Sequence, residues 1–382
     1  RLLPRHPRSL ARCVHYAAQK MSFSAVDHGM MARALQLAAR GLWTTTPNPR
    51  VGCVLVRDGW VVGEGWHEKA GEPHAEVLAL NAAGRRVRGA TAYVTLEPCS
   101  HHGRTPPCAE ALIEAGVARV VVAMTDPNPL VAGKGLALLE AAGIETACGL
   151  LETEARELNI GFVSRMTRGR PWLRLKAAAS LDGKTALNNG LSQWITGPDA
   201  RRDGQRWRAR ACAILTGIGT VRDDDPQLNV RDLETTRQPL RVVVDSKLET
   251  PLTARILQGG PCLIVGAVED AAKVELIRST GAEVLIFPNA AGKVELKDLL
   301  DELGRRGINE VHAEAGFKLN GSLLREGLVD ELLLYLAPCL IGHDASGLFN
   351  LPELTALDQK KQLKIRDLRQ VGENIRVIAR FS

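Results

Sequence analysis

Segments of strand character alternate with segments of helical spacing along most of this chain, and that alternation restricts it to α/β folds. Apolar residues recur at helical spacing from Met31 to Ala38, and an apolar run over 51–56 predicts a buried strand. Asp58-Gly59 is a typical hairpin turn and leads into a strand at 60–63. Helices and strands then alternate at 75–82, 93–96, 109–115, 120–123 and 136–141. This series predicts a three-layer α/β domain that ends near residue 150.

A second series begins after Arg168-Gly-Arg-Pro171, where glycine and proline mark the best candidate for a linker. The segment 152–162 before it has the pattern of a connecting helix. Apolar runs of strand length follow, separated by helical patterns, and predict a larger α/β domain with a mainly parallel sheet. These strands are expected at 172–179, 214–215, 240–244, 263–265, 284–287, 311–313 and 332–336. We therefore expect a leader over 1–26, a first domain over 27–168 and a second domain over 169–382.

The distribution of charge and cysteine narrows the class of protein. The net charge is +6, but the first 20 residues carry five cations and no acid, so the remainder has a charge of only +1. That balance gives little reason to expect nucleic-acid binding, and no apolar run approaches the roughly 18 residues of a membrane span. Eight scattered cysteines without a secretory signal favour a reducing, cytoplasmic compartment. The leader is expected to be non-native or upstream-translated sequence, with targeting as the alternative.

Four residues carry the chemistry of the first domain: His74, Glu76, Cys99 and Cys108. One imidazole and two thiolates make a ligand set for zinc that leaves the fourth position to water, as catalysis requires. Zinc lowers the pKa of water toward neutrality. Glu76 lies two residues after His74 at the start of a helix, where it can move the water proton without binding the metal. With Pro98 before Cys99, the pattern resembles the signature of zinc-dependent base deaminases.

Three alternatives remain open for this pattern, the first being that His74 is an ordinary surface or core histidine and the cysteines merely pack. Eight residues separate the two cysteines where the usual signature has two, and His101 or His102 could supply a fourth ligand to a structural zinc site. A non-catalytic binding protein with structural zinc is therefore one rival. A deaminase acting on tRNA is another, although it requires a basic surface that the charge distribution does not indicate.

The second domain offers one clue of its own. An apolar strand over 311–313 runs through Gly316 into a turn and helix that contain Asn320-Gly-Ser322. Free amide groups and the dipole at such a helix start favour phosphate. The segment is not a G-x-G-x-x-G fingerprint, so the residues leave two interpretations open: a phosphate- or nucleotide-binding domain, or merely a tight α/β loop.

The run Thr95-Leu-Glu-Pro-Cys-Ser-His-His-Gly-Arg-Thr-Pro-Pro-Cys108 resembles the bifunctional riboflavin-biosynthesis deaminase-reductases, which share the long insertion between the cysteines. Matching segments begin at Pro47, Ala70, Asp126, Ala179, Ser192, Asp223 and Glu314, so the resemblance runs from about residue 28 to the C-terminus. It implies a cytidine-deaminase-like domain with one zinc ion, followed by a dihydrofolate-reductase-like domain that uses NADPH. The implied reactions are deamination of a phosphoribosylaminopyrimidine and reduction of its ribosyl group.

The resemblance also implies residue roles. In the first domain, Asn48 and His67 would hold the pyrimidine, and the loop from His101 to Arg104 would shape the pocket. The implied NADPH contacts are Ala178, Trp194, Thr220, Asp224, Ser246, Gly316, Leu319, Asn320, Gly321 and Ser322, while Phe317 and Lys318 stand where the family varies. The implied substrate contacts are Ser192, Arg208, Leu228, Arg231 and Glu314, with the arginines suited to phosphate. Association into a homodimer through the second domain is expected.

Overall fold

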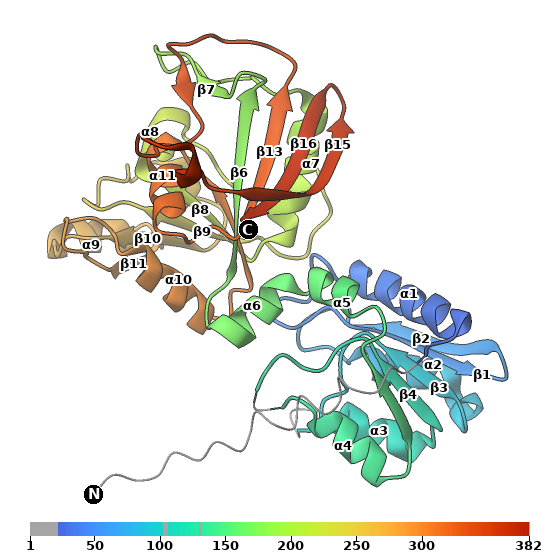
Figure 1. Ribbon diagram of the computed structural model, residues 1–382. Coiled ribbons are helices and arrows are strands. Elements are labelled where there is room, and N and C mark those ends of the chain that lie inside the picture. The colour runs from blue at the N-terminus through green and yellow to red at the C-terminus, as the bar shows by residue number, and fades with distance from the viewer. Residues whose placement is uncertain (1–21, 102–105, 130, 382) are drawn as a thin grey trace, which may run out of the picture. The chain divides into compact units, whose positions relative to one another are not determined.

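The computed structural model describes residues 22–101, 106–129 and 131–381, and the chain divides into two compact units between Thr167 and Arg168 (Figure 1). The expected leader lies largely outside the described residues, and the first helix already begins at Ala25. None of the helices in the described ranges combines the length and apolar character needed to traverse a bilayer.

The first unit is built on a five-stranded sheet with the strand order β2-β1-β3-β4-β5. The hairpin β1-β2 and the pair β1-β3 are antiparallel, whereas β3, β4 and β5 run parallel. The strands are β1 Gly52–Arg57, β2 Trp60–Trp66, β3 Thr91–Val94, β4 Arg119–Val122 and β5 Glu145–Cys148. The predicted opening hairpin is confirmed, and β5 is a strand that the sequence patterns did not indicate.

Helices cover both faces of this sheet. They are α1 Ala25–Arg40, α2 Ala75–Ala83, α3 Cys108–Ala115, α4 Lys134–Ala141, α5 Glu152–Leu158 and α6 Ile160–Arg168, with a 3-10 turn at Gly84–Val87. Glycines allow the closest approaches, because a Cβ on Gly52 would lie 2.0 Å from the Ala34 carbonyl of α1 and one on Gly65 would lie 2.4 Å from the Ala75 carbonyl of α2. Residues 52 and 65 lie in adjacent registers of β1 and β2, so α1 and α2 pack on opposite faces. The predicted three-layer arrangement is confirmed.

The expected single helix over 152–162 is wrong, because the segment forms two helices that meet at Asn159. The Asn159 side chain accepts from the Arg50 amide at 2.8 Å and donates to the Arg50 carbonyl at 2.9 Å. This two-way bond with the irregular segment before β1 fixes Asn159 between the helices, and the second helix extends to Arg168. The spacing of apolar residues in the sequence does not reveal this hydrogen bond, so it predicts one continuous helix.

The second unit contains a nine-stranded sheet with the order β11-β10-β9-β8-β12-β6-β13-β16-β15. The strands from β11 to β13 are parallel, and β16 and β15 extend the sheet antiparallel, so the prediction of a mainly parallel sheet is confirmed. The strands are β6 Trp172–Ser180, β8 Ala213–Gly217, β9 Leu240–Val244, β10 Cys262–Gly266, β11 Glu283–Ile286, β12 Glu310–Glu314, β13 Glu331–Ala337, β15 Leu363–Val371 and β16 Asn374–Phe381. A small ribbon pairs β7 Lys184–Ala186 with β14 Ser346–Gly347.

In the described part of the second unit, the sheet is accompanied by the helices α7 Pro198–Arg210, α8 Ile218–Asp224, α9 Ala271–Arg278, α10 Leu296–Arg305 and α11 Phe317–Arg325, with 3-10 turns at Arg255–Leu257 and Leu357–Gln359. One apolar cluster includes Leu299 and Leu303 of α10 and Leu323 of α11. A second includes Val221 of α8 and Ile277 of α9.

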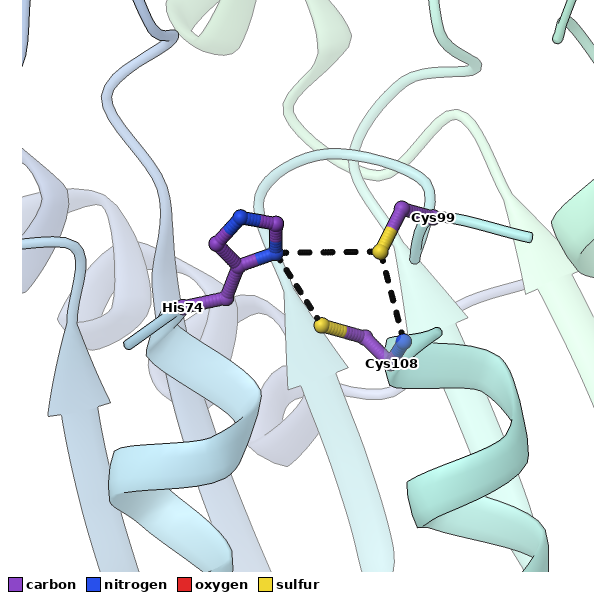
Figure 2. Close-up of side chains that lie close together, drawn as sticks. All are labelled: His74, Cys99 and Cys108. Carbon is purple, nitrogen blue, oxygen red and sulfur yellow. Dashed lines mark hydrogen bonds between the residues drawn. The ribbon is translucent and has the colours of Figure 1, made fainter. Parts of the chain in front are cut away.

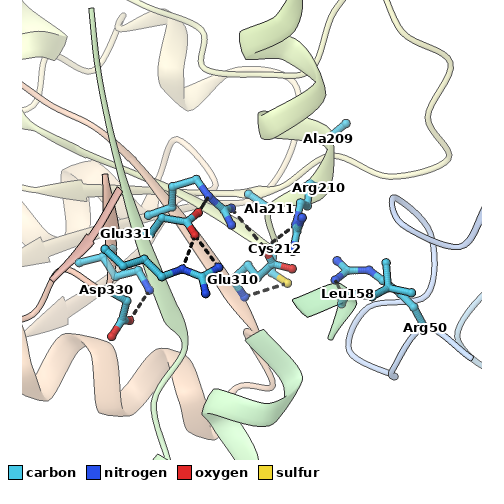
Figure 3. Close-up of polar contacts among 12 residues, drawn as sticks. Arg50, Leu158, Ala209, Arg210, Ala211, Cys212, Glu310, Asp330 and Glu331 are labelled. Atoms are coloured by element: carbon cyan, nitrogen blue, oxygen red, sulfur yellow. Dashed lines mark hydrogen bonds and ion pairs between the residues drawn. The ribbon is translucent and has the colours of Figure 1, made fainter. Parts of the chain in front are cut away.

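A buried ionic network ties three central strands together near their amino ends (Figure 3). Arg174 of β6 lies 2.5 Å from Glu331 of β13 and 3.2 Å from Glu310 of β12, and all three side chains are almost fully buried. Arg210 completes the shell of Glu310 at 2.7 Å, and Arg380 bonds Glu331 at 2.8 Å. Because each buried carboxylate has two guanidinium partners, the network fixes the relative positions of these strands.

Candidate active sites

The structure brings His74, Cys99 and Cys108 into one cluster in the first unit (Figure 2). Their ligand atoms all lie within 4.8 Å of one another, with His74 Nδ1 at 3.2 Å from Cys108 Sγ and 3.7 Å from Cys99 Sγ. Tetrahedral zinc with ordinary bond lengths would set a nitrogen and a sulfur ligand about 3.5 Å apart. The nitrogen and sulfur donors and their spacing therefore fit zinc.

Local structure explains how the three ligands meet. His74 is the residue before α2, in extended backbone, and Cys108 opens α3 directly after Pro107. Cys99 follows β3 on a loop, and the backbone amide of Cys108 donates to its sulfur at 3.3 Å. A hydrogen bond from the Cys108 thiol lowers the pKa of Cys99 to about 4 and raises that of Cys108. Two helix starts thus converge on one thiolate.

Glu76 lies in the first turn of α2 and is almost completely buried. Burial is the main reason that its pKa rises to about 7, and the nearby Cys99 thiolate adds to the effect. Glu76 is not part of the ligand cluster. A carboxyl group that shares the site without binding the metal is the arrangement expected of a group that transfers protons.

Asn48 and His67 lie beside the cluster. The Asn48 amide nitrogen is 3.1 Å from His67 Nε2, and His67 Nδ1 is 3.1 Å from the Pro73 carbonyl. Because a carbonyl only accepts, Nδ1 carries the proton and Nε2 accepts from Asn48. The imidazole rings of His67 and His74 meet edge to face at 5.4 Å, and burial lowers the pKa of His67. The expected pyrimidine contact His67 therefore adjoins His74 of the cluster, and Asn48 is hydrogen-bonded to His67.

The loop between the cysteines is only partly described. His101 is described and does not join the ligand cluster, which leaves the cluster with three ligands among the described residues. His102 and Arg104 lie outside the described residues.

The candidate substrate site of the second unit centres on Glu314 and Arg208. The Arg208 Nε and Nη2 atoms lie 2.5 and 3.0 Å from the two carboxylate oxygens of Glu314, and Lys176 Nζ lies 3.8 Å away. Burial opposes ionisation of Glu314, but Arg208 and Lys176 outweigh it and hold its pKa well below the usual range. The sequence reasoning missed Lys176. The sequence does carry a signal for Lys176: Arg174 and Lys176 are two cations at alternate positions of an otherwise apolar strand.

Two more expected substrate contacts lie on the segment beside Arg208. Arg208 Nη1 donates to the Asn229 carbonyl at 3.2 Å. The buried Leu228 is the residue before Asn229, so it belongs to the segment that Arg208 contacts. Arg231 is exposed and is attached through its backbone amide, which donates to the Gln205 side chain at 3.0 Å. The structure thus gathers Arg208, Glu314 and the segment around Leu228.

Most of the expected NADPH contacts follow the carboxyl ends of neighbouring parallel strands, where open α/β sheets bind ligands. Thr220 and Asp224 follow β8, Ser246 follows β9, and Gly316 follows β12. A Cβ on Gly316 would lie 3.7 Å from the Thr220 hydroxyl, and one on Gly217 would lie 3.3 Å from the Leu319 side chain. The residues after β8 and β12 therefore lie side by side.

Several of these side chains already have partners. The Ser246 hydroxyl accepts from the Val294 amide at 3.3 Å, and the Ser322 hydroxyl donates to the Lys318 carbonyl and accepts from Arg325. The Asn320 amide nitrogen donates to the Ala315 carbonyl at 3.0 Å. A Cβ on Gly321 would lie 2.3 Å from the Asn350 carbonyl, so this glycine permits a close approach of two backbone segments.

The remaining expected contacts lie on β6 and on the segment after β7. Trp194 is 69% exposed, its ring lies 4.6 Å from the Arg201 guanidinium, and its peptide bond with Gln193 is cis. The Gln193 side chain donates to Asp224 at 3.3 Å, which brings the half-buried Ser192 and the exposed Trp194 next to α8. Ala178 packs on a small cluster that contains Tyr335. A large exposed indole near this site is available to pack against a ligand.

Both units match models of known protein families. Residues 24–124 match the model of the cytidine and deoxycytidylate deaminase zinc-binding region, and residues 171–377 match that of the RibD C-terminal domain. Riboflavin biosynthesis protein RibD of Escherichia coli K12 is 52% identical over 363 residues, covering 91% of this chain and 98% of that protein. The Haemophilus influenzae RibD is 50% identical over 374 residues, covering 94% and 98%.

Solved structures, among them the following two, match across both units. Acinetobacter baumannii RibD, form 1, has a TM-score of 0.87 and 46% identity, covering 94% of this chain and 99% of that one. A Thermotoga maritima diaminohydroxyphosphoribosylaminopyrimidine deaminase/5-amino-6-(5-phosphoribosylamino)uracil reductase has a TM-score of 0.83 and 32% identity with the same coverage. The first unit is thus a cytidine-deaminase-type zinc domain and the second a reductase domain of the dihydrofolate-reductase-like type. The chain belongs to the RibD family of bifunctional deaminase-reductases of riboflavin biosynthesis.

Proposed function

We propose that residues 27–168 deaminate 2,5-diamino-6-(5-phosphoribosylamino)pyrimidin-4(3H)-one and that residues 169–382 reduce the product to 5-amino-6-(5-phosphoribitylamino)uracil. The observation that carries the first reaction is the three-ligand cluster with a buried carboxylic acid beside it. His74, Cys99 and Cys108 would hold one zinc ion. Zinc in such a site supplies a water whose pKa is lowered toward neutrality and polarises the bond under attack.

Glu76 moves the protons of this reaction. It is buried next to the ligands without being one of them, so its carboxylate can take a proton from the attacking water and pass it to the departing amine. The helix start at Ala75 holds it close to His74, which limits the distance that a proton must travel.

Asn48 and His67 orient the pyrimidine. Their mutual bond uses the Asn48 amide nitrogen, so the amide oxygen of Asn48 is available to accept from a ring N–H or an amino group. His67 is held neutral with its proton on Nδ1, so its Nε2 accepts the hydrogen bond from Asn48 and the orientation of the Asn48 amide is fixed.

In the second unit we assign the nicotinamide cofactor as NADPH, which supplies the hydride. The NADPH contacts are those implied by the resemblance, at the carboxyl ends of β6, β8, β9 and β12 and on the segment of Trp194. Glu314 is fixed by Arg208 and Lys176 and presents its charged carboxylate to the ribosyl group. The exposed Arg231 is better placed than the paired Arg208 to bind the substrate phosphate. Ser192 and Leu228 complete the substrate contacts.

We also propose that the protein is a cytoplasmic homodimer that associates through the second unit. The cysteines in the described part of the chain are free, which agrees with a reducing compartment. Light scattering of the purified chain measures the assembly directly.

The decisive experiment compares Glu76→Gln with Glu72→Gln, which removes the same charge from an exposed side chain four residues earlier. Glu76→Gln should keep one zinc per chain, lose about 10²- to 10⁴-fold in ammonia release and retain NADPH oxidation with the deaminated substrate. Glu72→Gln should match the parent in all three. Unchanged ammonia release by Glu76→Gln would contradict the assignment. NADH in place of NADPH tests the cofactor preference.

A further inference from the structure

A buried carboxylate lies two residues before the ligand Cys99. Glu97 is 4% exposed, and its two oxygens accept four backbone N–H groups from the segment 126–136. The Oε2 atom accepts from Asp126 at 3.0 Å and Gly133 at 2.9 Å, and Oε1 accepts from Gly135 at 2.8 Å and Leu136 at 3.3 Å. One side chain thus holds both ends of a loop that follows β4.

The location of these donors explains why a carboxylate is required. Gly133 is the residue before α4, and Gly135 and Leu136 lie in its first turn, where backbone N–H groups have no partner within the helix. The positive end of the helix dipole and the free amides stabilise a negative charge. Among the described residues, backbone amides are the partners of Glu97, so the charge is held by the helix start.

The same region is locked by close packing. A Cβ on Gly135 would lie 2.0 Å from the Pro98 carbonyl and 3.2 Å from Glu97 Oε1, so the backbone of α4 touches the backbone that leads to Cys99. The Glu97 amide also donates to the Met124 carbonyl at 3.0 Å, which continues the pairing of β3 with β4. Residues 97–98 are therefore fixed on two sides before the chain reaches the ligand.

We propose that Glu97 is a positioning residue for the metal centre: by binding the start of α4 it fixes the backbone from which Cys99 reaches the cluster. This inference rests on the proposed zinc site. Outer-shell residues that orient metal ligands typically change metal affinity by 10- to 100-fold, and Glu97 acts through the backbone instead of through the sulfur. Glutamine cannot replace it, because the amide has one accepting oxygen and would point its NH₂ at amide donors.

The test uses the full-length protein and compares Glu97→Gln with Asp27→Asn. Asp27 is a matched control, since it is also a buried carboxylate of the first unit with four hydrogen-bond donors, and it lies on α1, across the sheet from α2. Both variants convert a carboxylate to an amide and should destabilise the unit. Zinc affinity is measured by competition with a chelator, and cobalt substitution reports thiolate ligation through the sulfur-to-cobalt absorption bands.

We expect Glu97→Gln to lower zinc affinity by 10- to 100-fold and to alter the cobalt spectrum, while Asp27→Asn keeps the parental affinity and spectrum. Equal losses in the two variants would show that affinity follows overall stability and would overturn the inference, as would unchanged affinity in Glu97→Gln. Absence of stoichiometric zinc in the parent protein would contradict the proposed metal site itself. NADPH oxidation with the deaminated substrate checks that the second unit remains folded in every variant.

Discussion

Arg208 and Glu314 form a bidentate ion pair, although 106 positions separate them. The guanidinium comes from α7 and the carboxylate from the end of β12, so the pair joins a covering helix to the sheet at the candidate substrate site. The family resemblance in the sequence implies that Arg208 and Glu314 are two separate substrate contacts. The pairing changes that interpretation, because Arg208 holds Glu314 in one orientation and Glu314 occupies the two atoms of Arg208 best suited to phosphate.

Replacing Arg208 with methionine should therefore destabilise the second unit. Both side chains are largely buried, and removing one partner leaves the Glu314 charge with Lys176 as its nearest cation. Loss of one partner of a buried pair costs about 3–5 kcal/mol, and because Lys176 is retained we expect the lower end of this range, about 3 kcal/mol. Hydrogen exchange of peptides from α7 and β12 measures it. Adding Glu314→Gln to the same chain should recover part of the loss, and no recovery would contradict the pairing argument.

Removal of a zinc ligand should separate the two activities. Cys108→Ser replaces a thiolate with a hydroxyl that is a poor zinc ligand, so zinc content and ammonia release should both fall to background. NADPH oxidation with the deaminated substrate should persist, because the second unit is a separate compact body. Cys339→Ser, at an exposed cysteine of the second unit, is the control and should change neither metal content nor deamination. Parental zinc content in Cys108→Ser would sink the ligand assignment.

The fold was predictable where burial is two-sided and the sequence shows continuous apolar runs. The central strands β8, β9, β10, β12 and β13 are of this kind, and all were predicted. The edge strand β15 was missed, because Ile365 and Leu368 are each 63% exposed and the strand lacks a buried stripe. Its neighbour β16 is more buried, but the polar Asn374 and Arg376 are among its buried residues and interrupt an apolar run. Strand pattern reflects burial, so an edge strand with little burial leaves a weak signal.

The metal ligands were predictable because the signature is local: His74 precedes Glu76 by two residues, and a proline precedes Cys99. Glu97 was not predicted, although it belongs to the same run of residues. Its partners are backbone amides 29 to 39 positions away. Every residue except proline has such an amide, so the sequence does not show which of them bind a carboxylate. The pairing of Arg208 with Glu314 was missed for a related reason, since composition does not reveal which charges meet.

A buried glycine of β1 and an exposed glycine of α1 allow a packing test. Gly52→Ala should destabilise the first unit by about 1–3 kcal/mol, because its methyl group would lie 2.0 Å from the Ala34 carbonyl and force α1 off the sheet. Gly29→Ala, within α1, has no atom within 4 Å of the new Cβ and should stabilise the helix by about 0.5–1 kcal/mol. Hydrogen exchange across α1 measures both. Effects of equal sign would contradict the close packing of α1 on β1.

Asp27 should make the first unit sensitive to acid. Burial alone would raise its pKa, but hydrogen bonds from Arg119, Ser24 and Tyr93 outweigh it and hold the pKa well below the ordinary value of 3.8. A lowered folded-state pKa stabilises the fold at pH values above the unfolded pKa and loses that contribution as the pH falls toward the folded pKa. Asp27→Asn should therefore be less stable than the parent by about 2 kcal/mol near pH 7.

That difference should stay constant down to about pH 5 and shrink below about pH 4, where the unfolded state of the parent begins to bind a proton that the variant cannot. Hydrogen exchange of peptides from α1 and β3 at pH 7, 5, 4 and 3 follows the opening free energy in the full chain. Glu114→Gln, at an exposed carboxylate on α3, should show no such difference at any of these pH values. If the difference in opening free energy between the parent and Asp27→Asn widens on acidification, the stabilisation does not come from the charged Asp27 carboxylate, and the prediction is wrong.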